Sequence, residues 1–241
     1  MALQRTGDRR AGIGATRTAA TKNIWHQAGG QRYAAGNMVI DSTGSYDSTN
    51  TGDTRVLSPG TILGRITTGG LYRPAILATT ITSATAASAA TALTLANAAQ
   101  AVALNANAFS NPTTLSAVSA PTGTGTVATL SVTVTAINTT TGVLTVGGLS
   151  AAIAGGSILA ATDGSLTPRG VLDEYVNLLD ESAADTDPPL SRLAIAGVLK
   201  TGSLVNATST LLGASVYTWL KGQLSNAAQG PEFQFDDNFV G

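Results

Sequence analysis

Residues 61–74 read TILGRITTGGLYRP, and they carry the clearest local pattern in the chain. Residues 61–67 are rich in β-branched side chains, which favour a strand. Residues 68–70, Thr-Gly-Gly, supply turn chemistry, and residues 71–74 extend again. Two extended segments joined by a glycine-rich turn predict a β-hairpin. On both sides of this hairpin we expect further short strands and many turns.

A second hairpin is predicted closer to the C-terminus. Between residues 131 and 135, valine alternates with serine or threonine, which is the period of a half-buried strand. A five-residue loop at 138–142 then leads into residues 143–146, so the two segments form a hairpin with a longer connection. Residues 168–172 and 193–199 predict two further strands, the second of them buried.

One helix is predicted, because four apolar residues recur at the spacing that places side chains on one helical face. They are Leu212, Val216, Leu220 and Leu224. Further along, Phe233 and Phe235 alternate with polar residues, which indicates a closing strand or an apolar clip. Residues 81–109 are rich in Ala and Thr without a clear period, and a helix or two weak strands both fit them.

The composition favours a mainly β protein with a little α. Charged residues make up 11% of the chain, whereas about 25% is typical. Ala, Thr, Ser and Gly replace them, and these residues suit strands and turns better than long charged helices. The lack of cysteine excludes disulfides, thiolate zinc sites and thiol nucleophiles. No apolar run of about 18 residues is present, so we expect no membrane partner and synthesis in the cytoplasm.

Charge is divided sharply along the chain. Residues 1–73 have a net charge of +5, residues 74–162 contain no Asp, Glu, Lys or Arg, and residues 163–241 have a net charge of −6. Soluble monomers normally need dispersed surface charge. The uncharged middle third therefore indicates a protein that sits among other subunits. The opposed ends fit either contacts between neighbouring copies or contacts within one chain.

These changes divide the chain into three expected parts. Residues 1–40 form an extended basic N-terminal arm, in which apolar residues are too scattered for helical or strand periodicity. Residues 41–76 together with 161–241 form the main body. Residues 77–160 form a small β domain inserted into that body.

Three groups of residues resemble, in their order along the chain, the bacteriophage lambda head decoration protein family. They are GTILGRIT at 60–67 with GLY at 70–72, DGS at 163–165 with PRGVL at 168–172, and AGVLKTGSL at 196–204. Each is mainly turn chemistry, so their order is more informative than any one of them. The resemblance covers about residues 57–76 and 161–240.

This resemblance implies a compact decoration-protein core and a function in reinforcing a phage head. Such proteins are expected as homotrimers at threefold positions on the outer surface of the expanded capsid, with an N-terminal arm that orders against the major capsid protein. The chain departs from the family pattern in its long arm and in the insertion at 77–160. The expected location is the outer surface of the virion, after synthesis in the host cytoplasm.

Within this interpretation, two sets of residues are candidates for contacts. The expected capsid contacts are Arg5, Arg9, Arg10, Arg17, Lys22 and Trp25. The expected contacts between subunits are Asp180, Glu181, Asp185, Asp187, Phe233 and Phe235. Solvated loop charge is the alternative interpretation of the four acidic residues.

The sequence offers no converging catalytic set, so we expect no enzyme and no catalytic, cofactor-binding or metal-binding residue. His26, the one histidine, stands beside Trp25 and is interpreted as a packing or hydrogen-bonding residue. Asp41, Asp47 and Asp53 are spaced by six, which matches no calcium loop.

Nucleic acid and carbohydrate are the two other partners to consider for the chain. Six basic residues in the first 37 are sparse for phosphate neutralisation, which argues against nucleic acid. The alternative function is a virion-surface adhesion or carbohydrate-binding module, because the neutral, Thr- and Asn-rich insertion would suit weak contacts to sugars.

Overall fold

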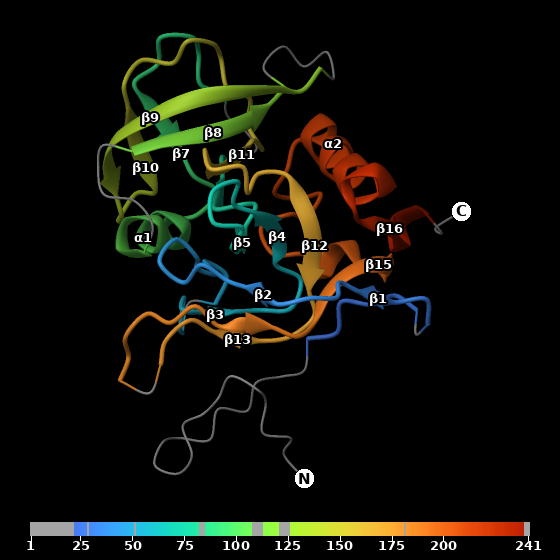
Figure 1. Ribbon diagram of the computed structural model, residues 1–241. Helices are drawn as coiled ribbons and strands as arrows, with labels where there is room; N and C mark the ends of the chain where they lie inside the picture. Colours follow the sequence, from blue (N-terminus) through green and yellow to red (C-terminus); the bar gives the residue numbers. More distant parts are fainter. Residues whose placement is uncertain are drawn as a thin grey trace.

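The computed structural model describes residues 22–27, 29–50, 52–81, 85–107, 113–120, 126–180 and 182–238. Strands dominate these residues and only two α-helices occur among them, which confirms the expectation of a mainly β protein with a little α. The strands form two six-stranded sheets and two short pairs. Figure 1 shows one sheet, drawn in green and yellow, above the other.

The first sheet, called the core sheet below, is formed by segments on both sides of the insertion. In spatial order its strands are β1 (Arg32–Tyr33), β15 (Leu193–Leu199), β12 (Pro168–Leu172), β4 (Ile62–Arg65) and β5 (Tyr72–Pro74), with β16 (Glu232–Phe235) parallel to β15. β4 and β5 pair antiparallel, which confirms the hairpin predicted at 61–74. The strands predicted at 168–172 and 193–199 are also confirmed.

Helix α2 (Ala214–Leu224) packs beside β12 at the core sheet (Figure 1). The predicted apolar stripe is confirmed, because Val216, Leu220 and Leu224 are buried in the core and Leu212 joins them just before the helix begins. Full burial of such side chains contributes about 1.5–3 kcal/mol each. Hydrophobic burial therefore holds this helix in place, although no side chain caps its N-terminus.

Residues 22–27 and 29–40 belong to the folded body, which corrects the expectation that the arm extends to residue 40. Ile24 and Trp25 are buried in the core, and β1 pairs with β15. Strand β2 (Met38–Val39) pairs with β14 (Pro189–Leu190). A few large side chains are enough to seat an irregular segment, even where no period predicts it.

The second sheet lies within residues 78–161 and curls until its two ends meet. In spatial order its strands are β6 (Ala78–Thr79), β11 (Ile158–Ala161), β8 (Thr113–Ser119), β9 (Ala128–Asn138), β10 (Val143–Val146) and β7 (Ala92–Thr94). The ring closes through Ile81 N–H to Thr94 O, 2.9 Å, and Ala96 N–H to Thr79 O, 2.8 Å. We call this sheet the barrel. Because β11 returns beside β8, strands β8 to β11 have Greek-key order.

The barrel interior is apolar, and strand alternation produces it. Val132 and Val134 are buried, while the residues between and beside them are exposed, as the alternation at 131–135 predicts. β10 pairs with β9 from Val143↔Asn138 onward, which confirms the second hairpin.

Residues 81–109 contain a short strand and a helix, so neither of the two open interpretations was complete. β7 comes first, and helix α1 (Ala98–Asn107) follows it. The side chain of Asn97 accepts a hydrogen bond from Gln100 N, 3.0 Å, which caps the helix start. Figure 1 shows α1 at one end of the barrel, where Ala101 and Leu104 join the apolar interior.

The first part of the polar segment, residues 41–48, is mostly buried. Tyr46 packs in the apolar cluster of the barrel, and its hydroxyl donates to Leu77 O at 3.0 Å. Burial raises the pKa of Tyr46. Strand β3 (Val56–Leu57) follows and pairs with β13 (Val176–Asn177). The 3₁₀ turns η1 (Thr201–Ser203), η2 (Ala227–Gln229) and η3 (Asp236–Asn238) complete the chain.

A buried polar chain fastens the barrel to the core. The side-chain amide of Gln100 in α1 donates to Asn206 Oδ1 at 3.2 Å and to Thr79 Oγ1 at 3.1 Å. Its carbonyl accepts from Thr79 N at 3.1 Å. Asn206 in turn donates to Ser48 Oγ at 3.1 Å. All four residues are buried, so these bonds satisfy groups that would be costly to leave unpaired.

Candidate functional site

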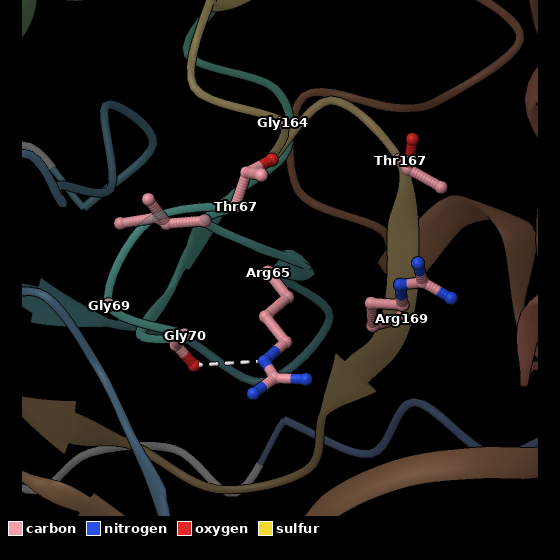
Figure 2. A pocket seen from close by; sticks show the side chains of 8 residues that line it. Arg65, Thr67, Gly69, Gly70, Gly164, Thr167 and Arg169 are labelled. Carbon is pink, nitrogen blue, oxygen red and sulfur yellow. Dashed lines mark hydrogen bonds between the residues drawn. The ribbon is translucent and has the colours of Figure 1, made fainter.

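A hollow of about 590 Å³ opens where the tip of the β4–β5 hairpin meets the turn before β12. Figure 2 shows the side chains of Arg65 and Arg169 in it, from neighbouring strands, together with the hydroxyls of Thr67 and Thr167. The remaining lining residues are Ile66, Gly69, Gly70 and Gly164. No Asp or Glu occurs among these lining residues. We call this site the arginine hollow.

Irregular strand ends aim the two arginines. On β12, Pro168 pairs with Gly64 and Gly170 pairs with Leu63, so Arg169 is the extra residue of a β-bulge. A bulge redirects the side chain of its extra residue. Arg65 is the last residue of β4, and its Nε donates to the carbonyl of Gly70 at 3.2 Å.

Two glycines let the walls of the hollow approach each other. A Cβ on Gly64 would meet the carbonyl oxygen of Ser165 at 1.7 Å. Gly164 has φ +96°, and a Cβ there would meet Thr67 Oγ1 at 2.2 Å. Thr67 N donates to Asp163 O at 2.8 Å across the same junction. The segments at 60–67 and 163–165 are therefore packed together, although the whole barrel separates them in sequence.

An ion network fixes the turn that forms one wall. Arg73 Nη1 lies 2.7 Å from Asp163 Oδ2, and Arg73 Nη2 pairs with Asp41. These three side chains are 13–23% exposed. Asp163 also accepts from Ser165 N at 2.9 Å and Ser165 Oγ at 2.6 Å. The carboxylate nearest the hollow in sequence is thus neutralised by Arg73.

The expected capsid contacts fall in two groups. Arg5, Arg9, Arg10 and Arg17 lie outside the described residues. Lys22 is half-buried. Burial lowers the pKa of its ammonium group, and the negative charge of Asp47 offsets only part of this shift.

Trp25, expected as the apolar anchor on the shell, is buried in its own chain. Its ring lies 6.4 Å from the rings of both Tyr33 and Phe233, centroid to centroid. A Cβ on Gly197 would meet the indole at 2.4 Å, so the glycine of β15 makes room for it. Within this fold the indole has little surface to offer a partner.

Phe233 and Phe235, expected between subunits, are also core residues. Both lie on β16 and are about 2% exposed or less. The parallel pairing of β16 with β15 turns the two rings toward α2, in one apolar cluster with Leu220. This agrees with the closing strand considered for these residues.

Residues 180 and 182–187 belong to an acidic loop that is mostly exposed. Asp185 pairs with Arg55, which also donates to Ser45 O at 2.6 Å and Ser42 O at 2.8 Å. Asp187 Oδ1 accepts from Ser42 N at 2.9 Å and Ser42 Oγ at 2.8 Å. Glu181 lies outside the described residues. The loop is therefore fixed at its base.

The tip of the acidic loop is a braced turn. Asp180 Oδ1 accepts from Ser182 Oγ at 2.7 Å, from Ser182 N at 2.8 Å and from Ala184 N at 2.9 Å. These bonds lower the pKa of Asp180, the Ser182 hydroxyl contributing most. Ala183 is held at φ +63°, a conformation that L residues rarely adopt.

The outer wall of the barrel is neutral and rich in hydroxyl groups. Thr114 faces Thr133 and Ser116 faces Ser131 across β8 and β9. The exposed hydroxyl side chains on the strands of this wall include Thr94, Thr114, Thr129, Ser131, Thr133, Thr135 and Thr145. Residues 74–162 contribute no charged side chain to it.

The three aspartates that are spaced by six in the sequence each bind different partners. Asp41 binds Arg73, Asp47 accepts from Thr49 and Ser58, and Asp53 accepts from Arg55 N. Across the described ranges, no three His, Asp or Glu side chains gather as a metal site would require.

The lone histidine stands near the C-terminal acidic turn. His26 is exposed, and its backbone N donates to Val198 O at 2.9 Å. For Asp236, burial alone would raise the pKa, but hydrogen bonds from Thr201 and the charge of His26 lower it.

Sequence reasoning quoted Arg65 and Arg169 within the motifs but missed them as a pair. The available signal was that each stands directly beside a glycine, Gly64 and Gly170, on an otherwise apolar strand.

No helix in the described part of the chain is long and apolar enough to cross a membrane. No family model, curated protein or solved structure matches the chain.

Proposed function

We propose that this protein is a capsid decoration protein that binds the outer surface of an expanded phage head, as a trimer at threefold positions, and stabilises the shell. The neutral barrel wall is the observation that carries this proposal. A surface without charge is a liability for a free protein, because solubility depends on dispersed charge. The same surface favours assembly, because few charged side chains lose their hydration when a partner covers it.

The arrangement of the resembling motifs supports the same proposal. They occupy β4 with the first residue of β5, the turn before β12 with the whole of β12, and the end of β15, and these strands are neighbours in the core sheet. The resemblance therefore concerns one contiguous unit, into which the barrel is inserted. The major capsid protein is the proposed partner of that unit, together with two further copies of the chain.

The proposed mechanism is the covering of joints between shell subunits. Each copy supplies a modest contact, and linkage of three copies raises the effective concentration of the second and third contacts. Such a cement binds tightly without any single strong site. Stabilisation follows by mass action, because the decoration protein binds the expanded shell and not its separated subunits.

The alternative, a carbohydrate-binding module on the virion, has less support. Sugars are held in part by stacking on aromatic rings, and the insertion at 77–160 contains one aromatic residue, Phe109, which lies outside the described residues. The hydroxyl-rich wall is the feature that keeps this alternative in view. A glycan-binding screen with the full chain separates the two functions.

The direct test is reconstitution on heads that lack the protein. Purified chain is added to expanded undecorated heads, and binding is measured by co-sedimentation and by imaging of the particles. We expect protrusions at the threefold positions and a higher temperature of head disruption. Absence of the chain from the particle surface at saturating concentration would overturn the proposal.

The role of the arm is tested with a shortened chain. Ile24, Trp25 and β1 are part of the core, so removal of the whole expected arm, residues 1–40, would also damage the fold. Removal of residues 1–21 is the informative deletion. We expect it to abolish head binding while the cooperative unfolding transition is kept, and normal decoration by this variant would exclude the arm as the capsid contact.

A further inference from the structure

We infer that the neutral barrel wall is a contact surface between copies of this chain, and that two copies pair wall to wall across a twofold axis. The occupant of the wall is the same wall of a second copy. This inference goes beyond the proposed function, because the pairing needs neither a capsid nor a trimer.

Four hydroxyl side chains form the centre of this surface, and we call them the hydroxyl square. They stand at two directly paired positions of β8 and β9, Thr114 opposite Thr133 and Ser116 opposite Ser131. Ser116 is half-buried and the other three are exposed. Among the residues that the structure describes, none of these four hydroxyl groups has a hydrogen-bond partner. The square is therefore available to a second molecule.

The hydrogen-bonding chemistry of the square is self-complementary. A hydroxyl group donates one hydrogen bond and also accepts hydrogen bonds, whereas a carboxylate only accepts and an ammonium only donates. Surfaces built from carboxylates or ammonium groups therefore need a partner of different composition. Two copies of the hydroxyl square satisfy each other, because each supplies both donors and acceptors.

The lack of charge favours the same pairing. Like charges on identical surfaces repel each other, and this repulsion helps to keep proteins monomeric. Residues 74–162 contain no Asp, Glu, Lys or Arg, so two barrel walls meet without such repulsion. No charged side chain of the barrel loses its hydration in the contact. A second copy of the wall is therefore a better match than a charged surface.

The backbone beneath the square is held on both sides. β8 and β9 pair with each other over residues 113–119 and 128–134, and β11 flanks β8 while β10 flanks β9. Threonine is β-branched, so its side chain has few conformations to lose. A surface that is ordered before binding loses little conformational entropy when it binds.

The position of the wall leaves room for a second copy. Figure 1 shows β8 and β9 side by side, at the opposite end of the molecule from β2 and β13. In a twofold contact the same patch is used on both copies, and the contact closes after two copies. The pairing therefore leaves the core sheet free for other contacts.

The pairing is expected to be weak. The wall of a barrel is convex, which limits the area that two copies cover, and small interfaces belong to transient complexes. We expect a dissociation constant on the order of 100 µM. A contact of this strength becomes effective where many copies are held close together.

Opposite charges placed on the wall test the pairing. One variant carries Ser131→Lys with Thr133→Lys, and a second carries Ser131→Glu with Thr133→Glu. Sedimentation velocity from about 10 µM to about 1 mM measures the doubling in mass of the species present at low concentration. We expect at least tenfold weaker doubling for each variant alone, because like charges then face each other, and recovery in a 1:1 mixture of the two variants.

Two further variants serve as a control and as a milder change. Thr218→Lys with Gln234→Lys adds the same charge at exposed positions of α2 and β16 and is expected to pair like the natural chain. Ser131→Ala with Thr133→Ala removes two hydroxyl groups without adding charge, and we expect at least threefold weaker doubling. This uncharged variant decides the question if circular dichroism shows that a charged variant does not fold.

The possible results separate this inference from the proposed function. A natural chain that does not double, a control that loses as much as the wall variants, or a mixture that does not recover would overturn the inference. Normal decoration of heads by the wall variants would leave the proposed function standing. Wall-dependent doubling of a chain that does not bind heads would leave the pairing standing and remove the decoration function.

Discussion

The core sheet and the barrel use different side chains to fix irregular segments. Around the core sheet, charged side chains fix these segments. Arg73 joins Asp41 to Asp163, and Arg55 holds the segment at 42–45. In the barrel, residues 78–161 include no charged side chain. Closure of the sheet and the buried amide of Gln100 take the place of ions.

The difference shows what closure makes possible. An open sheet has edge strands with unpaired backbone groups, and charged side chains commonly protect such edges from false pairing. A closed sheet has its edges paired, so its wall can be neutral without inviting strand addition. The barrel can therefore present a hydroxyl-rich surface that is covered at low desolvation cost, while the core sheet retains the charged groups.

The largest expected effect is on the ion network of the core. Arg73→Leu would leave the largely buried carboxylates of Asp41 and Asp163 without their counter-ion. Loss of one partner of such a network costs about 3–5 kcal/mol, measured as the free energy of unfolding in urea at pH 7. Arg65→Leu is the control and should change stability by less than about 0.5 kcal/mol. Equal effects of the two substitutions would contradict the role given to Arg73.

The next effect is on the link between the two regions. Gln100→Leu would leave the backbone N–H of Thr79 without its partner and would leave Asn206 Oδ1 with only the long bond from Ser48 Oγ at 3.4 Å. We expect a loss of about 2–3 kcal/mol, because buried groups left unpaired carry the full desolvation penalty. Asn105→Leu, on the exposed side of the same helix, should be nearly neutral. Urea unfolding of both variants checks the difference.

Acid should separate the regions without any mutation. The pKa of Asp236 is below its ordinary value in the folded chain, so its contribution to stability is present above about pH 4 and is lost as the pH falls through the lowered pKa. Residues 78–161 contain no ionisable side chain. Peptide-resolved hydrogen exchange at pH 3 and pH 7, corrected for intrinsic rates, should show opening at 232–238 and unchanged protection in the barrel.

The smallest effect concerns one alanine in each region. Ala183→Gly removes the strain of the left-handed conformation and should stabilise the chain by about 0.5 kcal/mol, after the added entropy of the unfolded state is counted. Ala136→Gly, at an exposed position in β9, should destabilise by about 0.5–1 kcal/mol. Thermal unfolding of the pair measures the difference in sign, and a loss at both positions would argue against strain in the acidic loop.

The sequence predicted the features that depend on near neighbours in the chain. Both hairpins and the stripe on α2 have periods that can be recognised within a few residues. Closure of the barrel depends on contacts such as Ile81 with Thr94, and a period does not reveal them. The helix in 81–109 was also hidden, because an Ala-rich segment without charges has no polar face to mark its period.

The candidate site was predicted less well, for a related physical reason. The motifs were recognised as turns, but the hollow exists only because Gly64 and Gly164 bring two distant turns into contact. Trp25 and Phe233 were assigned to surfaces, because large apolar residues in sparse segments suit either an anchor or a core. The two residues lie near opposite ends of the sequence, and their rings pack against each other in the core.

The connection between the two regions has one further consequence. The chain leaves the core sheet into β6 and returns from β11, and these two strands are hydrogen-bonded neighbours, with Ala78 opposite Leu159. Departure and return at a single crossing let this lobe vary in length without breaking any strand pair of the core sheet. On the function proposed above, a foreign peptide grafted at a turn of this lobe would be carried in many copies on one particle.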